Sequence, residues 1–175
     1  MDPLRPEPAE LRHPAAHVGA VAVEALECPT LLYNGFGEHN IQGIGDKHVP
    51  LIHNAMNTDF IVDISDKATD NLTALFNTDA GRAYLRDEMG VAEEVIEALP
   101  SFGYSSICNI LAAIKVAKQQ QLGPKDVIAT VATDGAGMYA SEIDGIVARD
   151  HRGTFDAAAA GEVRSRFLDG VDTAH

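Results

Sequence analysis

The chain has 175 residues, of which 46% are hydrophobic and 22% charged, and its formal net charge is −13. Such a chain is long enough for one globular domain with its own core, but its acidity argues against unaided binding of nucleic acid, which needs clustered lysine and arginine. No apolar run could span a bilayer, and the first residues have prolines and acids where a signal peptide has basic and apolar segments, so we expect a cytoplasmic protein without a membrane partner.

The N-terminal segment, residues 1–19, is rich in proline, alanine and glutamate and shows no regular period. This composition predicts a flexible leader or a partner-binding arm. The short apolar run that follows, residues 20–24, is typical of a buried strand, and a glycine-rich connection then extends to Gly45.

A second strand and an amphipathic helix come next. Residues 60–64 (FIVDI) are rich in β-branched side chains and predict the strand. Ser65 can cap the following helix, because its hydroxyl can accept a hydrogen bond from a free amide of the first turn. The apolar residues Leu72, Leu75 and Phe76 share one face of that helix at helical spacing.

Start and stop signals predict two further helices in the middle of the chain. One begins near Thr78 and runs toward Gly90, a natural C-terminal stop, and a short one covers residues 91–99. The acidic residues of this region are interpreted as a solvated helix face: Glu88, Glu93, Glu94 and Glu97.

The last predicted elements are two helices and a strand. A strong helix begins at Ser105 or Ser106 and carries a buried apolar stripe. Residues 127–133 (VIATVAT) form the third strand candidate, and one more helix is predicted over residues 155–168.

Strands separated by helices predict an α/β fold with a parallel sheet built from crossover units. Parallel sheets bury both faces and rarely stop at three strands, yet the sequence offers three convincing candidates. Either the sheet is small or another chain supplies the rest of it.

The segment GEHNIQGIGDKHVP, residues 37–50, contains the most informative spacing in the chain. Gly43 and Gly45, with Ile44 between them, let the backbone approach a ligand where a side chain would clash. The segment lacks the third glycine of a dinucleotide-binding motif and the lysine of a P-loop, so neither applies. In isolation, a tight surface turn remains the simpler interpretation.

Four blocks of the sequence, in order, resemble the cysteine synthase and tryptophan synthase beta family of pyridoxal-phosphate enzymes (fold type II). They are residues 21–29 (VAVEALECP), 37–45 (GEHNIQGIG), 101–117 (SFGYSSICNILAAIKVA) and 127–135 (VIATVATDG). The resemblance covers roughly residues 20–140. It implies part of the three-layer parallel sheet of that family's large domain, with pyridoxal 5'-phosphate as cofactor.

The resemblance assigns cofactor contacts residue by residue. Thr133 stands where the family places a small hydroxyl residue at the pyridine nitrogen, which suits β-elimination better than transamination. Asp134 follows directly, which leaves a carboxylate partner for that nitrogen as the alternative. Gly43 and Gly45 stand where the family's backbone lines the ring and the substrate, and Ile44 is expected to pack near the cofactor.

Substrate contacts are expected at Ser105, Ser106 and His48. The two serines are interpreted first as a helix cap, which would aim free amides toward a substrate carboxylate. His48 lies close behind the glycine loop, where it could gate the site or contact substrate. Cys108, on the helix of the serines, is interpreted as a core residue because no basic partner stands beside it.

No metal site is expected from the sequence. His39, His48 and His53 have a poor spacing for one helix face and no accompanying acidic ligand pattern. The two cysteines, Cys28 and Cys108, lack a second cysteine at metal-ligand spacing and are interpreted as free thiols.

The family's cofactor-binding lysine, in a Ser-x-Lys-like context, and its Gly-Thr-Gly-Gly-Thr phosphate loop have no counterpart in the sequence, and Met1 with its proline-rich leader resembles a genuine start. We therefore expect a split enzyme. Residues 20–140 would form the C-terminal half of the large domain, residues 141–175 a helical tail, and a partner chain would carry the lysine and the phosphate loop. Five lysines occur in other contexts, and those on predicted helices are expected to be solvated: Lys47, Lys67, Lys115, Lys118 and Lys125.

The function implied by the resemblance is one subunit of a heteromeric enzyme for β-elimination or β-replacement on an amino acid, with no catalytic residue in this chain. Two alternatives remain. One is a non-catalytic regulatory or interaction module derived from the same fold. The other is a small free-standing domain that binds a different phosphate ligand.

Overall fold

The computed structural model describes residues 18–45 and 47–171, so the leader predicted for residues 1–19 falls almost entirely outside it. Strands β1 (Val21–Ala25) and β2 (Phe60–Ile64) pair in parallel. The second strand is confirmed at its predicted bounds, and the first begins one residue later than predicted. The chain therefore has the mixed α/β architecture with a small parallel sheet that the sequence predicted.

The prediction of a third strand at residues 127–133 is wrong for the chain as described. The sheet there has two strands, and residues 121–133 are exposed and belong to no sheet. The β-branched composition of this segment favours a strand, but a strand needs a neighbour to satisfy its backbone groups. None of the described strands lies beside it.

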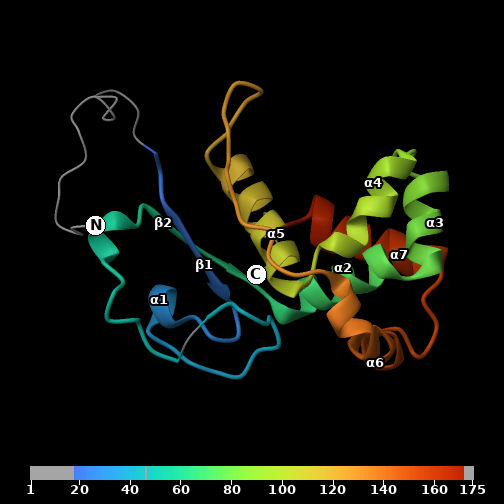
Figure 1. Ribbon diagram of the computed structural model, residues 1–175, viewed down its shortest axis with the longest axis horizontal. Coiled ribbons are helices and arrows are strands. Elements are labelled where there is room, and N and C mark those ends of the chain that lie inside the picture. Colours follow the sequence, from blue (N-terminus) through green and yellow to red (C-terminus); the bar gives the residue numbers. More distant parts are fainter. Residues whose placement is uncertain (1–17, 46, 172–175) are drawn as a thin grey trace, which may run out of the picture.

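Helices are the main regular secondary structure of the described chain (Figure 1). The bounds of most predicted helices are confirmed within a few residues. Two α-helices were not predicted: Thr30–Tyr33, which lies in the predicted glycine-rich connection, and Ala140–Asp150, of which Ile146 is the single fully buried residue. The α-helices are α1 (Thr30–Tyr33), α2 (Asp66–Asn77), α3 (Asp79–Asp87), α4 (Glu93–Ala98), α5 (Tyr104–Gln119), α6 (Ala140–Asp150) and α7 (Ala157–Val163). Short 3-10 turns cover Ala55–Asn57, Leu99–Ser101 and Ala136–Tyr139, and a π-helical turn follows α7 at Arg164–Asp169. None of the described helices is both long and apolar enough to cross a membrane.

Local capping explains where two of the helices begin. Ser65 Oγ accepts the Ala68 amide at 3.2 Å, as predicted, and Thr78 Oγ1 accepts the Gly81 amide at 3.1 Å. Each bond satisfies one of the free donors of a first helical turn. Gly90, with φ at +66°, terminates the turn after α3 in the left-handed region that favours glycine.

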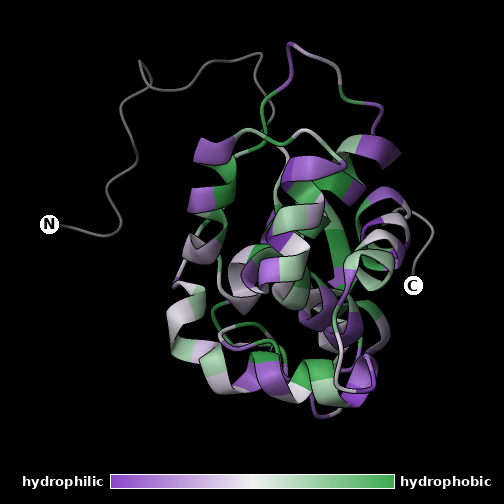
Figure 2. Ribbon diagram, turned by 90° about the vertical axis from the view of Figure 1, so that its right-hand side faces the viewer, coloured by the Kyte–Doolittle hydropathy of each residue, from purple (hydrophilic) through white to green (hydrophobic). Residues whose placement is uncertain are grey.

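The core is centred on α2 and α5. Leu72 and Leu75 of α2 and Ile107 and Leu111 of α5 are all at most 1% exposed. In Figure 1 these two helices lie between the sheet and the group formed by α3, α4 and α7. Figure 2 shows hydrophilic and hydrophobic residues mixed on the helical ribbons, as expected of amphipathic helices.

A cluster of partly desolvated carboxylates surrounds the N-terminus of α2. The Asp66 amide donates to Glu27 Oε2 at 3.0 Å, and Asp66 Oδ2 accepts the Asn40 amide at 2.9 Å. Asp70 accepts from the Asn40 side chain at 2.7 Å and from Arg149 at 2.6 Å. Burial raises the pKa of Glu27, Asp66 and Asp70 above their ordinary values.

These raised pKa values predict a pH dependence of stability. Between its unfolded and its raised folded pKa, each carboxyl binds more protons in the folded chain, so its contribution to the free energy of unfolding falls as the pH rises. Asparagine does not titrate, so Asp66→Asn should remove part of this fall in the free energy of unfolding. The stability of Asp66→Asn relative to the natural chain should therefore increase from about pH 4 to pH 7, as urea unfolding at each pH would show.

Asp79→Asn is the matched control, because Asp79 opens α3 as Asp66 opens α2 but is fully exposed. The difference in free energy of unfolding between Asp79→Asn and the natural chain should change less over the same pH range. A relative stability of Asp66→Asn that falls with rising pH would contradict the desolvation argument.

Candidate functional site

Three hydroxyl side chains meet where the N-terminus of α5 contacts the end of the extended segment 127–133; we call Ser105, Ser106 and Thr133 the hydroxyl cluster. The Thr133 amide donates to Ser106 Oγ at 2.9 Å. Thr133 Oγ1 lies 2.5 Å from Ser105 Oγ and 3.3 Å from Ser106 Oγ. Two residues that the sequence assigned to substrate are thus joined to one that it assigned to the cofactor.

The serines do not cap α5, so that part of the prediction is wrong. Gly103 is the N-cap residue, and the helix begins at Tyr104 without a side-chain cap. Ser105 and Ser106 lie inside the first turn, are 4% and 1% exposed, and direct their hydroxyls to Thr133.

Glycine is required at position 103 because α5 begins against the backbone of Asp134. The Gly103 amide donates to the Asp134 carbonyl oxygen at 2.8 Å. A Cβ atom on Gly103 would lie 3.0 Å from the backbone oxygen of Asp134 and 2.6 Å from its carboxylate oxygen Oδ1, so Asp134 would have to move. This close approach brings Thr133 within reach of the serines.

Both carboxylate oxygens of Asp134 are occupied. Thr133 Oγ1 donates to Oδ1 at 3.0 Å, and the Tyr139 hydroxyl donates to Oδ2. The Tyr139 bond, followed by the Thr133 bond, lowers the pKa of Asp134, so this group is a carboxylate at neutral pH. Tyr139 also packs edge-to-face on Tyr104, with ring centroids 4.8 Å apart.

The glycine loop reaches the hydroxyl cluster at Gly43. Both Gly43 and Gly45 have positive φ values, +82° and +81°, in the left-handed region that favours glycine. A Cβ on Gly43 would lie 3.9 Å from Ser105 Oγ, so the loop backbone lies next to the serine. Ile44, between the glycines, is half-buried and packs against the core.

Gly45 and His48 are not part of this arrangement. A Cβ on Gly45 would lie 2.8 Å from His39 Nε2, so this glycine faces a histidine instead of the serines. His48 is exposed at a bend further along the loop, and the contacts that form the hydroxyl cluster do not include it. The site residues that the structure brings together are Gly43, Ser105, Ser106, Thr133 and Asp134.

Two lysines on α5 bind groups outside the hydroxyl cluster. Lys115 Nζ donates to the Asp63 carbonyl oxygen at 3.3 Å and lies 3.6 Å from its carboxylate, with 13% of each side chain exposed. The prediction of a solvated Lys115 is therefore wrong. Lys118 Nζ donates to the Asp169 carbonyl oxygen at 2.7 Å.

Cys108 is a core residue, as predicted. It is fully buried, and burial raises the pKa of its thiol to about 12, so it is not a nucleophile at neutral pH. Within residues 18–45 and 47–171, no group of three histidine, cysteine or acidic side chains is arranged to hold a metal ion.

Sequence reasoning missed two residues that complete the site, Gly103 and Tyr139. Gly103 precedes the predicted start of the helix, and a glycine at that point could have suggested the cap. Tyr139 reaches Asp134 through a 3-10 turn at Ala136–Tyr139, for which the sequence has no strong signal.

Comparison with known proteins identifies the fold. No family model and no curated protein matches the sequence. Among the solved structures, a crystal structure of cysteine synthase (OASS) from Entamoeba histolytica matches with a TM-score of 0.57 and 20% identity, over 90% of this chain and 38% of that one. The chain thus spans well under half the length of that cysteine synthase, and it has the fold of part of it.

Proposed function

We propose that this chain is one subunit of a pyridoxal-phosphate-dependent enzyme that catalyses β-elimination or β-replacement on an amino acid. The cofactor-binding lysine and the phosphate loop would lie on a partner chain. The observation that carries the proposal is the hydroxyl cluster, in which Thr133 meets Ser105 and Ser106 beside Gly43. The likeness to part of a cysteine synthase supports the same assignment.

The residues present fit one side of the cofactor. Pyridoxal phosphate, when bound, supplies an electron sink for the carbanion at the substrate α-carbon. A hydroxyl such as that of Thr133 can donate to the pyridine nitrogen without protonating it. The missing Cβ of Gly43, next to Ser105, leaves room for a ring close to the loop backbone.

The proton arrangement of the cluster suits this role. A threonine hydroxyl has one proton and can rotate, so Thr133 can turn its donor from Asp134 to a ligand acceptor. Ser105, 2.5 Å away, can then donate to Thr133 Oγ1 and hold it in place. In this proposal Asp134 keeps the bond from Tyr139 and acts as a positioning residue. The alternative, in which this carboxylate binds the ring nitrogen itself, is the competing assignment.

The charge of the chain supports a shared site. With a net charge of −13, the chain does not attract a phosphate by its overall field. An anionic cofactor then needs local amides or a complementary surface on the partner chain.

Co-expression with the adjacent reading frame, with a tag on this chain and pyridoxal phosphate in the buffers, tests the proposal. We expect a stoichiometric yellow complex. Reduction with borohydride followed by peptide mass spectrometry should find the pyridoxyl group on a lysine of the partner chain.

The two other outcomes separate the alternatives. A colourless complex would contradict the cofactor role and favour the non-catalytic interaction module. A pyridoxyl group on one of this chain's own lysines would contradict the split site. The same experiment on the solitary tagged chain, which should remain colourless, is the control.

A further inference from the structure

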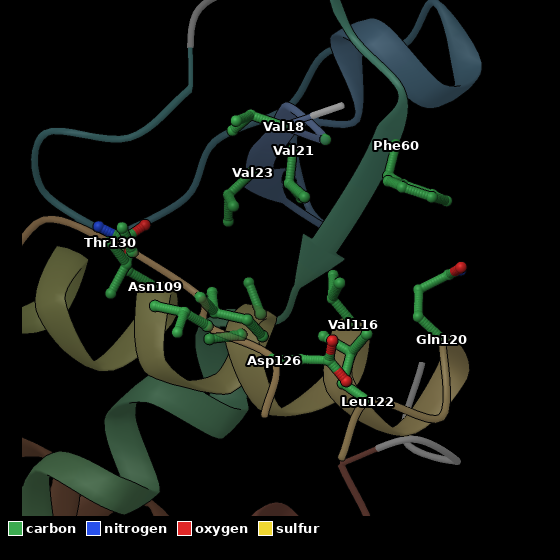
Figure 3. A pocket seen from close by; sticks show the side chains of 16 residues that line it. Val18, Val21, Val23, Phe60, Asn109, Val116, Gln120, Leu122, Asp126 and Thr130 are labelled. Carbon is green, nitrogen blue, oxygen red and sulfur yellow. The ribbon is translucent and has the colours of Figure 1, made fainter. Parts of the chain in front are cut away.

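An apolar groove of about 670 Å³ lies between β1, α5 and the extended segment 127–130. In Figure 3, Val21 and Val23 project from β1 toward Val116 of α5, with open space between the two elements. Asp126 is the one charged side chain among the lining residues, so an occupant of matching chemistry is apolar and uncharged.

Two of the elements that line the groove, β1 and the extended segment, have a backbone edge without a strand partner in the described part of the chain. Among the described residues, β1 pairs with β2 on one side and with no strand on the other. The extended segment, residues 127–133, is anchored at two points: the Asn109 side chain donates to the Val131 carbonyl oxygen at 2.9 Å, and the Thr133 amide donates to Ser106. Exposed strand edges of this kind accept an added strand.

Exposed apolar side chains mark the same surface. Val127 and Phe60, which line the groove, are 90% and 37% exposed, and Val131, further along the segment, is 64% exposed. Exposed apolar side chains beside open strand edges are typical of a protein interface.

We propose that an apolar β-strand of a second polypeptide, the chain carrying the remainder of this fold, inserts between β1 and residues 127–133. The inserted strand would join the two-stranded sheet to the third predicted strand and form one continuous sheet over α5. The inference rests on the proposed function, because the inserted strand belongs to the chain that shares the cofactor site in that proposal.

The comparison favours one occupant of the groove, a strand from the part of the cysteine synthase fold that this chain lacks. This chain matches 38% of the cysteine synthase chain, so more than half of that fold has no counterpart here. A strand in the groove would also lie along the segment that ends at Thr133. The inserted strand of the partner chain would therefore lie next to the hydroxyl cluster.

Hydrogen–deuterium exchange on the co-expressed complex and on the solitary chain tests the inference. Amides of residues 127–132 should exchange rapidly in the solitary chain and at least about 100-fold more slowly in the complex. Amides of residues 21–25 that face the groove should gain protection too. The amides of α6, which does not line the groove, should change little and serve as the internal control.

A pair of variants on α5 provides a second test. Ala113 lines the groove and Ala117 does not, although both are partly exposed positions of one helix. Ala113→Glu places a charge in the groove and should weaken association at least about tenfold, because an unpaired charge is poorly tolerated in an apolar interface. Ala117→Glu should leave association unchanged. Thermal unfolding of both variants identifies any failure to fold.

The outcomes separate this inference from the proposed function. A yellow complex whose residues 127–132 remain unprotected would overturn the inserted strand and leave the enzyme proposal intact. A colourless complex with these amides protected would support the strand and overturn the cofactor role. Protection already present in the solitary chain, or the absence of any complex, would overturn the inserted strand.

Discussion

Gly81→Ala is expected to destabilise the chain by about 2 kcal/mol or more, against the usual preference of helices for alanine. In an open helix the change would stabilise by about 1 kcal/mol. Here the new Cβ would lie 2.1 Å from the carbonyl oxygen of Leu75 and 2.8 Å from its carbonyl carbon. Overpacking of this kind costs about 1–3 kcal/mol, and the obstacle is the backbone of α2, which cannot rotate away.

We expect the destabilisation by the steric clash to exceed the stabilisation from the helix preference of alanine, because the clash also disturbs a helix cap. The Gly81 amide donates to Thr78 Oγ1, so a shift of α3 away from Leu75 would lengthen this bond. Loss of a cap costs about 1 kcal/mol. For a chain of this size, a loss of 2 kcal/mol lowers the midpoint of thermal unfolding by roughly 4–8 °C.

Gly145→Ala is the matched control. Gly145 lies within α6, and a Cβ there would meet nothing within 4 Å. This variant should therefore be as stable as the natural chain or more stable, by up to about 1 kcal/mol. Equal effects of the two substitutions in calorimetry would contradict the steric argument.

Elements that depend on local signals could be predicted from the sequence. Ser65 and Thr78 cap their helices through bonds to amides three residues ahead, so the signal and its structural partner lie in one short window. Leu72 and Leu75 share a helix face whose periodicity is visible in the sequence, and both are buried as predicted.

Elements that depend on distant partners could not be predicted in the same way. The composition of residues 127–133 favours a strand, but a sheet also needs a neighbouring strand, and the described chain does not place one there. Serine is a common N-cap residue, which favoured Ser105 as the cap of α5. The N-cap is Gly103 instead, because Asp134, which is distant in sequence, lies against it. The meeting of Gly43 with the hydroxyl cluster depends in the same way on the packing of segments far apart in the chain.

Thr133→Ala is expected to lower turnover of the two-chain enzyme on the order of tenfold and to shift the visible absorbance of its bound cofactor. The variant removes the donor proposed for the pyridine nitrogen. A hydrogen bond of this kind contributes about 0.5–1.5 kcal/mol, and about 1.4 kcal/mol corresponds to a factor of ten in rate. The spectral shift follows because the electronic environment of the ring changes with that bond.

Thr133→Ser is the control, because serine and alanine at this position differ by the hydroxyl alone. Serine keeps the donor and its contact with Ser105, so its spectrum and turnover should stay close to those of the natural complex. Equal losses in both variants would indicate that the methyl group of Thr133 matters through packing. In Thr133→Ala the backbone amide of residue 133 still donates to Ser106, so the segment should stay on α5. An unchanged spectrum and an unchanged rate in this variant would therefore contradict the assignment of Thr133 to the cofactor.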